Sequence, residues 1–124
     1  MRVVDTSAWI EGIVLKASGI VTRLPSREDW VVPTLVQMEL AKWLNREAEA
    51  AFTEAVLAYM SKCVVVDLTS PIALSAAEYT RLYKLSTADA IIYATAVETS
   101  SDLLTCDAHF ENLPQVVYVP KIKA

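Results

Sequence analysis

Short apolar runs alternate with longer stretches of helical periodicity along the chain, and this alternation restricts the possible folds most strongly. The apolar runs predict five strands, at residues 2–5, 30–32, 63–67, 103–106 and 116–119. Helices are predicted at residues 6–16, 35–46, 48–61, 70–84 and 87–98, while residues 17–29 form a loop or a short helix. Strands that alternate with helices are typical of a parallel sheet between helical layers. The sequence therefore predicts an α/β fold, a three-layer α/β/α sandwich with a mostly parallel central sheet.

Residue types at the ends of these elements support the boundaries. Thr34 is the predicted N-cap of the helix over 35–46, and Ser70 starts the next-but-one helix with Pro71 at its first position. Pro33 and Pro120 end the strands that precede them. The strand runs are apolar without alternation, which predicts that both faces of the sheet are covered. The order of the strands does not follow from the sequence.

The chain has 124 residues, of which 54% are hydrophobic, so one domain over residues 1–124 is expected. No apolar run reaches the roughly 18 residues that a membrane span requires. The chain enters its first strand without a signal peptide, and we therefore expect a cytoplasmic protein. Cys63 and Cys106 adjoin apolar runs and are expected to be buried, without a zinc site or a disulfide framework.

The composition also narrows the chemistry. The two glycines, Gly12 and Gly19, belong to no phosphate-binding loop, which argues against ATP-driven and dinucleotide chemistry. The single histidine, His109, excludes a mechanism that needs two histidines. The net charge of −4 argues against a protein that binds nucleic acid by overall charge alone. It leaves open an enzyme that brings metal ions to a phosphodiester.

Four of the fifteen acidic residues lie where the predicted sheet can bring them together. Asp5 and Asp107 directly follow predicted strands, and Glu39 lies one turn into the helix after the second strand. Ligands of open parallel sheets bind at the carboxyl ends of the strands, so these three acids are expected at one edge. Asp89 joins them if its helix begins at that edge.

Each of these acids also has an ordinary structural interpretation. Asp5 and Asp107 can cap the helices that follow them. Glu39 can form an i,i+3 ion pair with Lys42 on a solvated helix face. Asp89 can complete a capping box, although an acid at the head of a helix that is apolar nearly all round is unfavourable unless it is paired or bound to a metal.

A cluster of the four carboxylates requires protonation or a cation. Two like charges about 4 Å apart repel by about 4 kcal/mol at an effective dielectric constant of about 20. Carboxylate oxygens select hard ions such as Mg²⁺ or Mn²⁺ over zinc. The sequence thus predicts a divalent metal site formed by Asp5, Glu39, Asp89 and Asp107.

Four segments, in order along the chain, resemble the acidic motifs of the PIN-domain family, and most closely those of its VapC toxins. They are VVDTS at 3–7, MELA at 38–41, STADAIIYATA at 86–96 and LTCDAHF at 104–110. The resemblance covers nearly the whole chain. It implies an endoribonuclease that depends on Mg²⁺ or Mn²⁺ and hydrolyses phosphodiesters with metal-activated water. It also implies a homodimer that is inhibited by a cognate antitoxin, whose C-terminal segment enters the acidic cleft.

The resemblance implies individual roles as well. Metal binding and catalysis fall to Asp5, Glu39, Asp89 and Asp107. Supporting roles fall to the hydroxyl groups of Thr6, Ser7 and Thr105. Glu111 lies just beyond the fourth motif and is left out of the core site.

Single-stranded RNA is the expected substrate, because a splayed backbone enters a cleft more easily than a duplex does. Basic residues that flank the acidic motifs are candidates to hold it, and each can also be an ordinary surface residue. They are Lys42, Arg46, Arg81 and Lys84. Trp9, Trp43 and Tyr93 can stack on bases, or they can pack in the core with their apolar neighbours.

Other functions stay open at this point. A PIN nuclease of RNA maturation has the same site without a toxin role. Phosphatases of the haloacid-dehalogenase type carry a phosphorylated Asp after the first strand and usually a second Asp two residues later, where this chain has Ser7. The remaining alternative is a binding module, either an inactive PIN relative or a receiver-like domain. Receivers usually have paired acids near the first strand and a lysine after the last one, whereas Lys121 follows Pro120 in the predicted tail, 121–124.

Overall fold

Five parallel strands form one sheet in the computed structural model, which describes residues 1–121, so that most of the predicted tail lies outside the described residues. The strands are β1 (Arg2–Val4), β2 (Trp30–Pro33), β3 (Val64–Val66), β4 (Asp102–Thr105) and β5 (Val116–Tyr118). Their order in the sheet is β3-β2-β1-β4-β5, and every neighbouring pair is parallel. The predicted α/β fold with a parallel sheet is therefore confirmed, and the strand order is new information.

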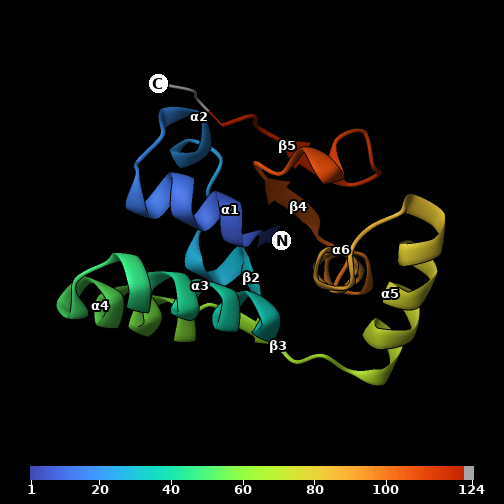
Figure 1. Cartoon of the computed structure of the whole chain (residues 1–124), viewed down its shortest axis with the longest axis horizontal. Helices are drawn as coiled ribbons and strands as arrows, with labels where there is room; N and C mark the ends of the chain where they lie inside the picture. The colour runs from blue at the N-terminus through green and yellow to red at the C-terminus, as the bar shows by residue number, and fades with distance from the viewer. Residues whose placement is uncertain (122–124) are drawn as a thin grey trace.

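Helices flank the sheet on two sides. In Figure 1, α3 and α4 lie to the lower left of β4, whereas α5 and α6 lie to its right. The α-helices are α1 (Thr6–Trp9), α2 (Ser18–Val21), α3 (Thr34–Glu47), α4 (Ala50–Ser61), α5 (Ser70–Tyr83) and α6 (Thr87–Glu98). Shorter or wider turns form the π-helix η1 (Ile10–Val14) and the 3₁₀-helices η2 (Arg27–Asp29) and η3 (Ala108–Phe110).

The first predicted helix, over residues 6–16, changes character along its length. After one turn of α-helix it continues from Ile10 as a π-helix, in which the Leu15 N–H donates to the Ile10 carbonyl at 2.9 Å. Gly12 lies in this segment, and a Cβ atom there would come within 2.7 Å of Ile20 Cγ2. The lack of a side chain at Gly12 is thus what lets α2 pack so closely against η1. Residues 17–29, for which the sequence left two possibilities, contain the short helices α2 and η2.

The predicted N-cap of α3 and the predicted place of Pro71 in α5 are each wrong by one residue. Pro33, not Thr34, occupies the N-cap position of α3, because proline keeps the end of β2 extended and Thr34 is already helical. Helix α5 begins at Ser70, as predicted, and Thr69 caps it, because Thr69 Oγ1 accepts a hydrogen bond from the Ile72 N–H at 3.4 Å. Pro71 consequently falls at the second helical position rather than the first.

The three central strands are covered on both faces, whereas the two edge strands are not. Exposure is 0% for Val3, Val4, Val31, Val32, Leu103 and Leu104. At the edges, Val65 of β3 is 38% exposed and the residues of β5 are half-buried. The expectation of complete coverage therefore holds for β1, β2 and β4 only, since an edge strand has fewer neighbours to cover it. The helix α6, predicted to be central, buries half of its residues.

The cysteines and the lengths of the helices bear on two expectations from the composition. Cys106 is buried and Cys63 is half-buried, and both are free thiols. Within residues 1–121, no helix combines the length and the apolar character that crossing a membrane requires.

The strand order reverses between β1 and β4. The strands β1, β2 and β3 proceed toward one edge of the sheet, whereas β4 and β5 lie on the other side of β1. Val4 is in register with Leu104, and the Asp5 N–H donates to the Leu104 carbonyl at 2.9 Å. A reversal of this kind leaves a crevice beyond the carboxyl ends of the two strands. The residues that follow Val4 and Leu104 emerge side by side at this crevice.

The amino ends of the same two strands are joined by an ion pair. Arg2 Nε lies 2.8 Å from Asp102 Oδ1, and Arg2 Nη2 lies 2.9 Å from Asp102 Oδ2. Arg2 Nη1 also donates to the Arg23 carbonyl at 2.7 Å. The hydrogen bonds to Asp102 raise the pKa of Arg2. At this end of the strands, a basic side chain of the chain itself neutralises the acid.

Candidate active site

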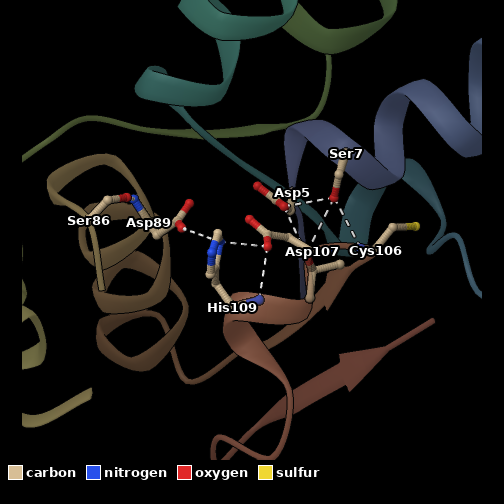
Figure 2. A network of polar contacts seen from close by, with 8 residues as sticks. Asp5, Ser7, Ser86, Asp89, Cys106, Asp107 and His109 are labelled. Atoms are coloured by element: carbon tan, nitrogen blue, oxygen red, sulfur yellow. Dashed lines mark hydrogen bonds and ion pairs between the residues drawn. The ribbon is translucent and has the colours of Figure 1, made fainter. Parts of the chain in front are cut away.

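Asp5 directly follows β1, and two hydroxyl groups hold its carboxyl group. Asp5 Oδ2 accepts hydrogen bonds from Thr105 Oγ1 and from Ser7 Oγ, each at 2.8 Å. The same hydroxyl groups accept hydrogen bonds from the backbone after β4. The Cys106 N–H donates to Ser7 Oγ at 3.0 Å, and the Asp107 N–H donates to Thr105 Oγ1 at 2.9 Å. Figure 2 shows this network between the ends of the two strands. It fixes the Asp5 carboxyl group at the crevice.

Asp5 occupies the N-cap position of α1, but its side chain accepts no hydrogen bond from a backbone N–H group of that helix. The capping interpretation of Asp5 is therefore wrong. The residue is only 5% exposed, and burial raises the pKa of its carboxyl group to about 6 although the hydrogen bonds from Thr105 and Ser7 lower it. The negative charges of Asp89 and Glu39 raise the pKa of Asp5 further.

Glu39, in the second turn of α3, is connected to the end of β1. It accepts a hydrogen bond at Oε1 from Thr6 Oγ1 at 2.8 Å. Thr6 is the neighbour of Asp5 in the chain, so this bond holds α3 close to the crevice. The hydrogen bond to Thr6 takes the place of the ion pair with Lys42 that the sequence left open. Glu39 instead lines a groove on the surface of α3 together with Lys42 and Trp43.

Asp89 lies in the first turn of α6, and Ser86 caps this helix. Ser86 Oγ accepts a hydrogen bond from the Asp89 N–H at 3.3 Å, which is half of the predicted capping box. Burial raises the pKa of the Asp89 carboxyl group, and the negative charge of Asp107 raises it further. The charge of His109 and a hydrogen bond with Ser86 act in the opposite direction.

Asp107 and His109 belong to the turn that follows β4. Asp107 caps η3, because its Oδ1 accepts the His109 N–H at 2.9 Å, and the capping interpretation is correct for this oxygen. His109 Nδ1 lies 2.9 Å from the same Oδ1 and 3.8 Å from Asp89 Oδ2. The ligand atoms of Asp89, Asp107 and His109 all lie within 4.8 Å of one another. Figure 2 shows the imidazole between the two carboxyl groups.

His109 was not among the site residues predicted from the sequence. The signal that indicates it is the spacing of two residues from Asp107, because a side chain in a short turn can reach back to the side chain of the capping residue. Glu111, left out of the core site, occupies the C-cap position of η3 and is exposed.

The four predicted acids lie in one region at the carboxyl edge of the sheet. They come from four separate segments, yet the charges of Asp89 and Glu39 act on Asp5, and those of Asp107 and Glu39 act on Asp89. Mutual repulsion of this kind disfavours the ionised cluster unless a cation is present. Carboxylate oxygens with one imidazole nitrogen form a donor set that fits a hard or borderline divalent ion such as Mg²⁺ or Mn²⁺.

The predicted RNA-binding residues fall into two groups. Lys42 and Arg46 line the groove beside Glu39, and Arg46 Nε also pairs with Glu47 Oε1 at 3.0 Å. Arg81 pairs instead with Glu78 on the exposed surface of α5, at 2.6 Å, and Lys84 is the C-cap residue of that helix. The groove on α3 is therefore the basic surface that adjoins one of the four acids.

Two of the three aromatic candidates are core residues. Trp9 is 1% exposed and Tyr93 is 2% exposed, and the Tyr93 hydroxyl donates to the Pro114 carbonyl at 2.8 Å. Neither ring is accessible to a base, so the packing interpretation is correct for both. Trp43 is half-buried and lines the groove on α3.

A family model described as PIN domain matches residues 2–116. A comparison with curated proteins gives no match.

Several solved structures share the fold. A chain of a toxin–antitoxin complex from Klebsiella pneumoniae has a TM-score of 0.80 and 22% sequence identity, over 94% of this chain and 96% of that chain. A second similar chain belongs to the VapBC2 complex from Rickettsia felis, which was solved bound to a DNA fragment from the promoter of VapBC2. Its TM-score is 0.75 with 14% identity, over 96% of this chain and 97% of that chain. VapC20 from Mycobacterium tuberculosis, a toxin that cleaves the sarcin–ricin loop, has a TM-score of 0.68 and 20% identity, over 89% of this chain and 92% of that chain.

Proposed function

The chain belongs to the PIN domain family, and we propose that it is an endoribonuclease dependent on Mg²⁺ or Mn²⁺ that acts as the toxin of a type II toxin–antitoxin system. The observation that carries the proposal is that four carboxyl groups from separate segments lie within electrostatic range of one another at the reversal point of the sheet, with Asp89 and Asp107 close enough to share one ion. In this fold class, that point is where ligands bind.

The ion would be held by carboxylate oxygens of Asp5, Glu39, Asp89 and Asp107. When bound, it would lower the pKa of a water molecule and neutralise charge on the phosphate oxygens. The supporting hydroxyl groups keep the carboxyl groups in place. Thr105 and Ser7 hold Asp5 Oδ2, and Thr6 holds Glu39 Oε1. Preorganised ligands of this kind do not have to be ordered when the substrate arrives.

The groove on α3 is the proposed path of the RNA backbone. Lys42 and Arg46 supply positive charge beside Glu39, and Trp43 supplies an aromatic face. A basic groove with an aromatic side chain suits single-stranded nucleic acid, because it follows the backbone without reading base pairs. Arg81 and Lys84 remain predicted RNA contacts on another part of the surface.

The toxin role is supported by the fold. Two solved chains with the same fold come from toxin–antitoxin complexes. A third, VapC20, is a toxin that cleaves the sarcin–ricin loop. We propose by analogy that a cognate antitoxin inhibits this chain by covering the acidic crevice, and that the chain forms a homodimer.

The test of the activity is a cleavage assay on a panel of single-stranded RNAs. The purified chain should cleave at least one RNA with Mn²⁺ or Mg²⁺, should stop in EDTA and should recover with excess Mn²⁺. Cleavage that persists in EDTA, or no cleavage by the folded protein of any RNA in the panel, contradicts the proposal. Phosphate trapped on Asp5 would favour a phosphatase or a receiver-like module instead.

Growth of an expressing bacterium separates the toxin from a nuclease of RNA maturation. Expression of the chain alone should arrest growth, and the Asp5→Asn variant should not. Co-expression of a small inhibitory partner should restore growth. Harmless expression of a folded, cleavage-competent chain would favour RNA maturation.

A further inference from the structure

His109 is held beside two of the proposed metal ligands, although its side chain is 78% exposed. The turn that carries it is fixed at both ends. Asp107 caps η3 through the His109 N–H, and the next residue, Phe110, is 0% exposed and anchors the turn in the core. The neighbouring residues therefore hold the backbone of His109 in place. Its imidazole lies at the surface, between the carboxyl groups of Asp89 and Asp107 (Figure 2).

The distances around the imidazole fit ligands of a single ion. Ligands of an octahedral ion at about 2.1 Å are about 3.0 Å apart when adjacent and about 4.2 Å apart when opposite. Nδ1 lies 2.9 Å from Asp107 Oδ1 and 3.8 Å from Asp89 Oδ2, which falls within this range. The three ligand atoms lie within 4.8 Å of one another, so a small movement of the exposed His109 side chain is enough to place them around one cation.

We propose that His109 Nδ1 is a ligand of the divalent ion, together with Asp89 and Asp107, and that it makes the site prefer Mn²⁺ to Mg²⁺. Carboxylates suit both ions, whereas an imidazole nitrogen favours a transition metal over the harder Mg²⁺. The inference rests on the proposed function for the presence of the ion. It adds to that function a nitrogen ligand, His109 Nδ1, which determines whether Mn²⁺ or Mg²⁺ is preferred.

The direct test is pulsed electron paramagnetic resonance of the Mn²⁺-loaded protein. Because His109 is the single histidine, any imidazole nitrogen coupled to Mn²⁺ must come from it. The spectrum of the wild type should show this coupling, and it should change when the chain is produced with histidine labelled with nitrogen-15. The His109→Asn variant should bind Mn²⁺ without the coupling. Mn²⁺ bound to the wild type without imidazole coupling, or no bound Mn²⁺ at all, overturns the inference.

Metal affinities separate a ligand from a residue that only positions Asp107. By calorimetry, His109→Asn should lower Mn²⁺ affinity by about tenfold or more and change Mg²⁺ affinity by less than about twofold. Asp89→Asn is the matched control, because loss of a carboxylate should lower the affinities for both ions. Equal losses of both affinities in His109→Asn would mean that the imidazole only positions Asp107. A circular dichroism spectrum equal to that of the wild type verifies that each variant is folded.

The result is independent of the catalytic activity. If imidazole coupling is seen but no RNA is cleaved, the ligand assignment stands and the proposed nuclease function fails. If RNA is cleaved in a metal-dependent manner but no coupling is seen, the function stands and the assignment of His109 fails.

Discussion

The paired strands β1 and β4 have an acid at their amino ends, Asp102, and another at their carboxyl ends, Asp5. The surroundings of these two acids differ. At the amino ends, Asp102 forms a bidentate ion pair with Arg2. At the carboxyl ends, hydroxyl groups donate to Asp5 and other acids repel it, and burial raises its pKa to about 6. The first acid is neutralised within the chain, and the second is not.

We interpret this difference as that between a structural acid and the proposed metal-binding acid. An ion pair such as that of Arg2 and Asp102 needs nothing from outside the protein. A buried carboxyl group that faces like charges is unfavourable for stability, unless a ligand supplies the missing positive charge. The carboxyl end of the β1–β4 pair is thus the end at which we propose that a cation binds. Four predictions test this contrast.

The largest effect is expected when the same substitution is made at the two ends. Asp5→Asn should reduce metal-dependent RNA cleavage by about 1,000-fold or more, because it removes a charged ligand of the ion. Asp102→Asn should leave cleavage within about twofold of the wild type, because Asp102 lies at the opposite edge of the sheet. The measurement is kcat/KM with a fluorescent RNA. Similar losses in both variants would remove the contrast.

The second effect concerns stability without metal. The pKa of Asp5 is raised from 3.8 to about 6, so the folded state binds the proton more tightly than the unfolded state, and the group weakens the fold as pH rises from about 4 to above 6. In EDTA, the free energy of unfolding of Asp5→Asn minus that of the wild type should increase by about 3 kcal/mol between pH 4 and pH 8. Urea denaturation at several pH values measures this difference.

Asp102→Asn is the comparison for that experiment. It should lower the free energy of unfolding by about 1 kcal/mol or less, because it breaks a partly exposed ion pair. A difference between Asp5→Asn and the wild type that is flat with pH, or that decreases toward pH 8, would show that Asp5 is not a destabilised acid.

The third prediction concerns the hydroxyl network. Thr105→Val removes one donor to Asp5 Oδ2 at nearly constant volume and should lower kcat/KM by about 10- to 100-fold. Thr95→Val is the matched control, since Thr95 is also buried but donates to the Ile91 carbonyl within α6. A loss in the control as large as that in Thr105→Val would indicate a general packing effect.

The smallest effect is expected in the groove on α3. Lys42→Ala should weaken RNA binding by a few-fold and should reduce the slope of log K against log salt concentration by about 0.7, the value for one phosphate contact of a single strand. Lys62→Ala, at the C-cap of α4 and before β3, changes charge at the opposite edge of the sheet and should leave the slope unchanged. Filter binding with an inactive Asp5→Asn background measures both. Equal slopes for the two variants would contradict the proposed RNA path.

The elements that follow from local patterns could be predicted from the sequence. Apolar runs located all five strands, and periodicity located α3 to α6, because burial in the core determines the residue types there. The predicted cap at Thr34 and the predicted first helical position of Pro71 were each wrong by one residue, because Pro33 and Thr69 are the capping residues. Helix ends depend on single backbone angles, which periodicity does not determine. The π-helix and the strand order likewise depend on packing between distant segments.

The site was predictable to the same extent. Acids that follow strands could be placed at one edge, since the topology of a parallel sheet requires it. The partners of these acids could not be predicted, because they are set by side-chain geometry. The bond from Thr105 to Asp5 and the position of His109 between two carboxyl groups depend on the register of β1 with β4 and on the turn of η3. Only the folded structure supplies that geometry.

The most direct test of the account is an anomalous difference map from crystals of the chain grown with Mn²⁺. The account predicts a peak at the reversal point of the sheet, within about 2.2 Å of carboxylate oxygens that include those of Asp89 and Asp107. A map with no peak there at saturating Mn²⁺, or with Mn²⁺ bound only elsewhere on the surface, would contradict the claim that this crevice is a divalent metal site.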